Sequence, residues 1–299
     1  MKIFAPDYYK DFRCLMGECK HTCCAGWEID IDEETAEYYK SIPGDFGKKL
    51  CQNIDFGEDC ASFILAEHDR CPFLNEDGLC EIILNLGEEA ISQVCDDHPR
   101  FRNFYEGRTE IGLGLCCEAV AKMVIEKKTE TVITEIEDDG EEYEILPEEE
   151  EFFALREKVF SIAQERETDL EKRIEKILGL CSAELPEKDF AEWADIYLGL
   201  ERLDEKWTDV LEKIRENPAP PKDFDEISAE QLLCYFLFRH LSPWNLPETC
   251  AFAVLSLLMT EKAAEQVGIY EGARLYSSEI EYSDENIDAL LDIIGAERI

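Results

Sequence analysis

The sequence predicts a mainly α-helical protein with one small β-hairpin, in which a cysteine-rich N-terminal part packs on a helical C-terminal part. Three observations support this fold class. Eleven of the fourteen cysteines precede residue 118, the segment 129–146 alternates apolar and acidic residues, and apolar residues recur at helical spacing beyond it. We therefore divide the chain into a cysteine-rich region at 1–128, the hairpin at 129–146 and a helical region at 147–299.

The composition is that of a globular and strongly acidic protein. The 299 residues are 45% hydrophobic, and 30 basic side chains face 70 acidic ones, which gives a net charge of −40. Such a field repels nucleic acid and anionic lipid and favours cationic partners such as lysine-rich protein surfaces, although a merely soluble acidic protein has the same charge. No window approaches the ~20 apolar residues of a membrane span, and no apolar stretch of signal-peptide length follows Met1. We therefore expect a cytoplasmic protein with no membrane or nucleic-acid partner. Nothing in the sequence indicates an oligomeric state.

The first group of cysteines lies in RCLMGECKHTCCAGWEID at residues 13–30, which places four thiols within eleven positions. If 18–25 is helical, Cys19 and Cys23 share one face one turn apart, and Cys24 points towards a second surface. Because cytosolic thiols are normally kept reduced, this density favours metal ligation over disulfide bonds.

Three later cysteines continue the pattern. Cys71 and Cys80 flank the turn sequence Asn75-Glu-Asp-Gly78, which predicts a hairpin-like loop that brings the two thiols together. Cys95 follows an apolar run. Zinc accepts four thiolates but usually uses compact cysteine pairs, whereas the cysteine spacing of iron–sulfur proteins varies more widely. We favour an iron–sulfur cluster, with zinc, redox thiols and structural cysteines as alternatives.

The segment 129–146 predicts a hairpin that turns at Asp139-Gly140, with Ile133 on one strand and Tyr143 on the other. Beyond it, Pro147 begins a helix, and capping boxes at Thr168 and Ser228 begin two more.

The stretch LLCYFLFRHL at 232–241 is apolar nearly all round and predicts a buried helix. The three remaining cysteines lie in similar apolar surroundings, where we expect them to fill the core: Cys181, Cys234 and Cys250.

The motifs together resemble a known family. The pattern F-x-C-x4-C-x3-C-C-x-G-W-x-I at 12–29 is similar to the N-terminal signature of the flagellin lysine N-methylases, which are related to cysteine-cluster proteins described as zinc- or iron-chelating. The resemblance continues through C-P-F-L at 71–74, Val94-Cys95 and Cys116, and it extends to the helical segments. Cys117 stands where the family has proline.

The resemblance implies transfer of methyl groups from S-adenosylmethionine to lysine side chains of flagellin, in a protein that carries a Cys-ligated iron–sulfur cluster. The cluster is expected to be 4Fe–4S, with zinc as the alternative. The candidate metal ligands are eight cysteines: Cys14, Cys19, Cys23, Cys24, Cys71, Cys80, Cys95 and Cys116. The competing function is that of a non-catalytic iron- or zinc-binding protein that stores, delivers or senses metal.

A methyltransferase also needs a site for the substrate amine and the methyl donor. The candidates to line it are Arg100, Tyr235, Arg239 and His240, for which the alternative is a structural role in caps and salt bridges. The residues give no catalytic assignment. Gly112-Leu-Gly114 is half of a nucleotide-binding motif, and the rest of that motif is missing.

Overall fold

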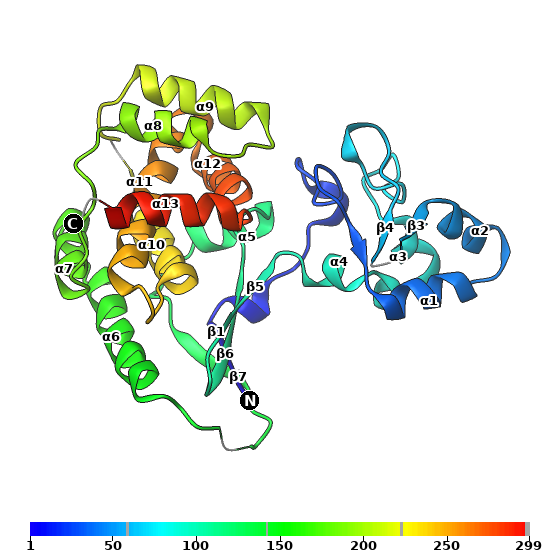
Figure 1. Cartoon of the computed structure of the whole chain (residues 1–299), viewed down its shortest axis with the longest axis horizontal. Helices are drawn as coiled ribbons and strands as arrows, with labels where there is room; N and C mark the ends of the chain where they lie inside the picture. Colours follow the sequence, from blue (N-terminus) through cyan, green and yellow to red (C-terminus); the bar gives the residue numbers. More distant parts are fainter. Residues whose placement is uncertain (58–59, 142, 222–223, 297–299) are drawn as a thin grey trace. The chain divides into compact units, whose positions relative to one another are not determined.

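The structure is a computed structural model that describes residues 1–57, 60–141, 143–221 and 224–296 (Figure 1). The chain forms two compact units. The cysteine-rich unit comprises Arg13–Arg100, and the helical unit comprises Met1–Phe12 together with Phe101–Ile299. Helices dominate and the sheets are small, so the predicted mainly α class is confirmed.

The cysteine-rich unit is built from short elements. They are β2 (Asp30–Ile31), α1 (Glu33–Ser41), α2 (Gly44–Gln52), β3 (Ile54–Phe56), β4 (Ala61–Phe63), α3 (Glu81–Leu86) and α4 (Gln93–Asp97). The strands form an antiparallel sheet in the order β2-β4-β3. Asp32 accepts hydrogen bonds from the backbone N–H of Thr35 and of Gln93, both at 2.9 Å. One carboxylate therefore fixes the first turns of both α1 and α4.

The helical unit contains one sheet and most of the helices. Its strands are β1 (Lys2–Pro6), β5 (Arg100–Phe104, which begins at the last residue of the cysteine-rich unit), β6 (Arg108–Leu113) and β7 (Ile133–Glu137). Its helices are α5 (Glu118–Ile125), α6 (Pro147–Ala163), α7 (Leu170–Leu180), α8 (Phe190–Gly199), α9 (Glu205–Glu216), α10 (Glu226–His240), α11 (Leu246–Val267), α12 (Ile269–Tyr276) and α13 (Asp284–Ala296). A π-helical segment, Ser277–Glu281, follows α12.

Helices α10 and α11 form the centre of the helical unit. The two pack against each other, α10 also contacts α5, α6 and α7, and α11 also contacts α9, α12 and α13 (Figure 1). The predicted buried helix at 232–241 is confirmed, because every residue of α10 from Ser228 to Phe238 is buried. Its start differs from the prediction: Asp225 caps the helix by accepting the N–H of Ser228 at 2.9 Å.

The predicted hairpin at 129–146 is wrong in its pairing. Strand β7 covers Ile133–Glu137 as expected, but its antiparallel partner is β1, and among the described residues of 138–146 there is no second strand. Strand β1 also pairs with β6 in parallel, which gives the order β5-β6-β1-β7. An alternating pattern specifies a strand without specifying the edge that it joins.

This pairing also moves the boundaries of the units away from 1–128 and 147–299. The N-terminal strand is part of the sheet of the helical unit, and α5, which follows Cys117 directly, packs on α10 and α12. The chain between 101 and 128 therefore belongs with the helices, and Cys116 and Cys117 with it.

Two buried carboxylates connect elements of this unit, one between helices and one between the sheet and a helix. Glu230 on α10 accepts hydrogen bonds from Arg166 at 2.8 Å and from Arg173 at 2.9 Å. Glu110 on β6 accepts one from Arg156 on α6 at 2.7 Å. Within the described chain, no helix combines the length and the apolar character that crossing a bilayer requires.

Candidate functional site

The loop that follows Cys71 is held by hydrogen bonds to the side chain of Asn75. The Asn75 side-chain oxygen accepts the backbone N–H of Asp77 at 3.0 Å and of Leu79 at 2.8 Å, and Gly78 takes a φ of +73°. Leu74 and Cys80 then pair in an antiparallel bridge. The hairpin-like loop predicted for 71–80 is therefore present.

Backbone contacts bring Cys24 to the same place. The Cys71 N–H donates to the Cys24 carbonyl at 2.8 Å, and Ala25 bridges to Arg70. Cys95 lies in the first turn of α4, where its N–H donates to the Ser92 carbonyl at 3.0 Å. Four cysteines from three segments of the chain thus meet in one core.

We call Cys24, Cys71, Cys80 and Cys95 the thiol tetrad. All four belong to or pack against the hydrophobic core of the cysteine-rich unit, and none forms a disulfide. They are close enough that every pairing among the four affects the pKa of at least one member. Tyr39, fully buried in the same core, interacts with three of them and donates its hydroxyl to the Ala90 carbonyl at 2.6 Å.

The four thiols differ in acidity. Burial raises the pKa of Cys71 to about 12 and that of Cys95 to about 11, and it also raises the pKa of Cys80. The pKa of Cys24 is lowered instead. A hydrogen bond from the Cys23 thiol lowers it to about 6, and the nearby Arg70 guanidinium contributes to the decrease. Of the four thiols, Cys24 therefore forms most readily the thiolate, which is the form that binds metals.

The side chains of the thiol tetrad offer sulfur donors alone. Among the side chains that the structure describes, no three from His, Cys, Asp and Glu are placed to hold a metal ion. The tetrad nevertheless gathers four sulfur donors and no oxygen donor, a set that suits zinc or an iron–sulfur cluster.

The hydrophobic core of the cysteine-rich unit does not include the other four predicted ligands, whose metal-binding role stays a prediction. Cys14 is exposed and accepts the Met16 N–H at 3.3 Å, and Cys19 is half-buried. Cys23 is exposed and interacts with Cys24 through its thiol. Cys116 belongs to the helical unit.

The helix considered for 18–25 is absent. A single 3-10 turn, Met16–Glu18, ends before Cys19, and the following residues form turns. Cys19 and Cys23 therefore do not share a helix face. Met16 has a φ of +51°, which is incompatible with continuous helix.

Three of the four predicted substrate-binding residues meet at a residue that the sequence did not single out, Glu281. Tyr235 donates its hydroxyl to Oε2 of Glu281 at 2.8 Å, and His240 Nε2 lies 2.6 Å from Oε1. Arg239 donates to the Glu281 carbonyl at 2.7 Å and to the Tyr235 hydroxyl at 2.9 Å. We call these four residues the Glu281 network.

Charge pairing keeps the Glu281 carboxylate ionised although it is buried. Burial would raise the pKa of Glu281, but the Arg239 guanidinium and the His240 hydrogen bond lower it to about 2. Burial lowers the pKa of His240 more than Glu281 raises it. His240 is therefore neutral at pH 7, and its Nε2–H donates to the carboxylate, which can only accept. Every member has its partner inside the network, so the geometry fits an interior brace better than a substrate-binding wall.

The other predicted features of the donor site have packing roles. Arg100 donates to the Asp96 carbonyl at 2.5 Å and lies in the cysteine-rich unit, apart from the Glu281 network in the chain. A Cβ on Gly112 would collide with the Phe101 ring, and one on Gly114 with the Tyr282 hydroxyl. Close packing of two aromatic rings therefore accounts for this glycine pair without a nucleotide.

Comparison with known proteins points to one group. The chain matches no protein-family model and no solved structure. Over 132 residues, 41% of this chain, it is 27% identical to proteins named Lysine-N-methylase from Salmonella choleraesuis (strain SC-B67) and Salmonella typhimurium (strain LT2).

Over the same length it is 28% identical to the flagellar biosynthetic protein FliU of Salmonella muenchen. The match covers 32% of each lysine-N-methylase and 76% of FliU, so the chain spans about a third of the length of the two methylases. The resemblance to this family that the cysteine motif indicated is confirmed at this level of similarity.

Proposed function

We propose that the protein is a protein-lysine N-methyltransferase that uses S-adenosylmethionine, carries an iron–sulfur cluster and acts on flagellin. The observation that carries the proposal is the similarity to proteins named Lysine-N-methylase and FliU. The net charge of −40 supports a lysine-bearing substrate, because an acidic surface attracts it.

The thiol tetrad supports the cofactor. Cys24, Cys71, Cys80 and Cys95 would hold the cluster, and the lowered pKa of Cys24 favours the thiolate form that binds metals. The other three would lose their protons on binding, so loading would release protons to solvent. When bound, an iron–sulfur cluster supplies one-electron chemistry, and the four thiols that would hold it belong to or pack against the hydrophobic core of the unit.

The methyl transfer requires no reactant besides S-adenosylmethionine and lysine. The methyl carbon leaves the sulfonium sulfur of S-adenosylmethionine and bonds to the lysine Nζ, which yields S-adenosylhomocysteine and one proton. The lysine must be neutral when it attacks. Because an acidic protein raises the pKa of a bound lysine, the site must supply desolvation or a base for that proton.

The test is a methyl-transfer assay with anaerobically purified protein, methyl-labelled S-adenosylmethionine and flagellin. Label on lysine, absent from flagellin whose lysines have been acetylated, supports the proposal. The Cys80→Ser and Cys24→Ser variants should lose cluster and activity, whereas Cys51→Ser should keep both, because Cys51 is exposed on α2 of the same unit. No labelling by protein with a full cluster contradicts the proposal.

A non-catalytic iron- or zinc-binding protein is the second candidate. The observation that favours it is that the tetrad lies in a compact unit with a hydrophobic core of its own, which is all that a binding module needs. Metal bound by the tetrad, without methyl transfer to flagellin or to other lysine-rich proteins, would select this function.

A further inference from the structure

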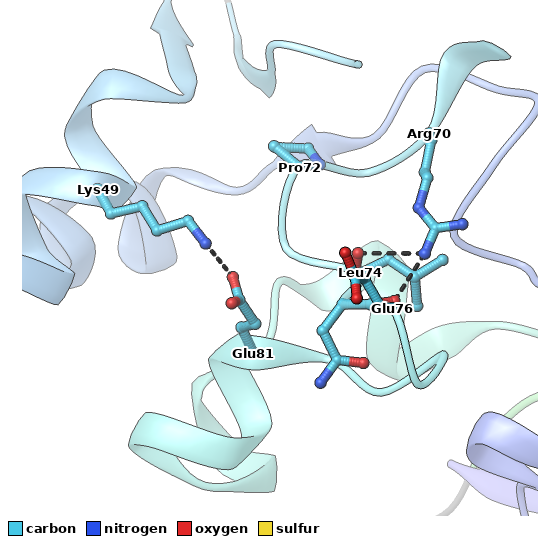
Figure 2. Close-up of a pocket in the computed structure, with 7 residues that line it drawn as sticks. Lys49, Arg70, Pro72, Leu74, Glu76 and Glu81 are labelled. Atoms are coloured by element: carbon cyan, nitrogen blue, oxygen red, sulfur yellow. Dashed lines mark hydrogen bonds and ion pairs between the residues drawn. The ribbon is translucent and has the colours of Figure 1, made fainter. Parts of the chain in front are cut away.

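A pocket of about 490 Å³ opens in the cysteine-rich unit (Figure 2). Its wall includes Pro72 and Glu81, which directly follow Cys71 and Cys80 in the chain. The loop that brings these two thiols together therefore also shapes the pocket. The volume lies within the range of small-molecule sites.

The pocket carries charges of both signs. Lys49 on α2 pairs with Glu81 in the first turn of α3, and Arg70 approaches from the other side of the view in Figure 2. Arg70 donates through Nη2 to the carbonyls of Leu74 at 3.3 Å and Asn75 at 2.7 Å. These bonds fix the guanidinium through one nitrogen, while Nε and Nη1 carry further N–H donors. Glu76 places an exposed carboxylate on the same wall.

Arg70 also connects the pocket with the tetrad. It directly precedes Cys71 in the chain, and its backbone bridges to Ala25, the residue after Cys24. A ligand that contacts Arg70 therefore lies beside the segments that carry these two thiols.

We propose that this pocket binds the amino-acid end of a small molecule, an ammonium group and a carboxylate on one carbon. Two basic and two acidic side chains line the pocket, so a simple anion meets the repulsion of Glu76 and Glu81, and a simple cation that of Lys49 and Arg70. The planar guanidinium of Arg70 suits the carboxylate of the ligand, and Glu76 suits its ammonium. Pro72 and Leu74 line the remainder with apolar surface for the side chain of the ligand.

This inference rests on the proposed function for the choice of ligand, because S-adenosylmethionine carries such an amino-acid end. It assigns the methyl donor to the pocket of the cysteine-rich unit, whereas the Glu281 network belongs to the helical unit. The first probe is S-adenosylhomocysteine, which has the same amino-acid end and transfers no methyl group.

Calorimetry on the metal-loaded protein gives the primary test. The Arg70→Met variant should weaken S-adenosylhomocysteine binding roughly tenfold or more, because it removes a charge-assisted hydrogen bond to the ligand carboxylate. Lys49→Met should weaken binding by a similar factor, because Glu81 then loses its ion-pair partner and repels that carboxylate. Lys48→Met is the matched control, since Lys48 is the exposed neighbour on α2, pairs with Asp45 and lies outside the pocket lining. It should bind like the wild type. Equal affinities in all three variants would overturn the proposal.

A second set of probes tests the head group itself. L-methionine should compete with S-adenosylhomocysteine for the pocket. Two analogues should compete at least roughly tenfold more weakly: the methyl ester of L-methionine, which lacks the carboxylate, and 4-(methylthio)butanoic acid, which lacks the ammonium. Glu76→Gln should reduce the preference for L-methionine over the acid. Equal competition by the three compounds, or no binding of either L-methionine or S-adenosylhomocysteine, would overturn the assignment.

The outcomes separate this inference from the proposed function. If labelled methyl reaches flagellin but Arg70→Met and Lys49→Met leave the affinity for S-adenosylhomocysteine unchanged, the donor binds elsewhere. The pocket assignment then fails and the proposed function stands. If L-methionine binds with the expected dependence on these two residues but no lysine is methylated, the pocket stands and the proposed function fails.

Discussion

The Glu281 network allows a quantitative prediction for the stability of the helical unit. The change is Glu281→Gln, which keeps the size of the side chain and removes its charge. Glu281 is buried, and its carboxylate accepts the hydroxyl of Tyr235 at 2.8 Å and Nε2 of His240 at 2.6 Å. Without it, the buried guanidinium of Arg239 loses its charged partner, whose Oε1 lies 3.4 Å from Nε.

The magnitude follows from the pKa of Glu281. The folded protein lowers this pKa from 4.5 to about 2. A gap of this size corresponds to roughly 3 kcal/mol of the free energy of unfolding. The contribution is complete above the unfolded pKa and is lost only as the pH falls towards the folded pKa. The cost of leaving one buried charge unpaired, about 3–5 kcal/mol, is of the same size.

Urea unfolding at pH 6, 7 and 8 measures the effect. Glu281→Gln should lower the free energy of unfolding by about 3 kcal/mol at all three pH values, because the carboxylate is ionised throughout this range. Glu285→Gln is the control, an exposed glutamate in the next helix, and should change stability by less than about 0.5 kcal/mol. A loss below about 1 kcal/mol would refute the reasoning. A loss that varies strongly between pH 6 and 8 would also refute it and would point to titration of His240 instead.

Three further predictions concern single residues. Glu230→Gln should cost about 3–5 kcal/mol in urea unfolding, because two arginines lose their buried partner, and an unchanged midpoint would contradict this. Gly114→Ala should lower the melting temperature, since its Cβ meets a tyrosine hydroxyl, while Gly179→Ala, which meets nothing within 4 Å, should leave it unchanged or raise it. In metal-free protein, iodoacetamide should modify Cys24 before Cys71, at a rate that rises as the pH passes about 6. Mass spectrometry reads the order, and earlier modification of Cys71 would contradict the assignment.

The features that local sequence determines were predictable. The helix at 232–241 is apolar on all sides and is buried, and α6 begins at Pro147 as expected. The asparagine and glycine of the 75–78 turn produce the loop that brings Cys71 close to Cys80, because their turn preference needs no distant partner.

The features that depend on distant segments were not predictable. Strand β7 pairs with β1, more than a hundred residues earlier in the chain, and an alternating pattern does not name its partner. Glu281 is one of 70 acidic residues, and only the packing of α10 against the segment after α12 distinguishes it. Arg70 gains its place beside Cys24 in the same way, through a bridge between two loops.

Which of the eight candidate cysteines pack in the hydrophobic core is also a tertiary result. Spacing in the sequence treats Cys23 and Cys24 alike, yet only Cys24 packs against the core, while Cys23 is exposed and donates its hydrogen bond to it. Neighbouring residues in a turn point in different directions, and the local sequence does not say which of them faces inward.

The measurement that tests the central claim most directly is the metal content of anaerobically purified protein. We expect about four iron and four sulfide per chain, with broad absorbance near ~400 nm, in the wild type and in Cys51→Ser. The cluster should be lost from Cys24→Ser, Cys71→Ser, Cys80→Ser and Cys95→Ser. A single zinc without sulfide, no metal at all, or a cluster that survives all four substitutions would contradict the assignment of the thiol tetrad.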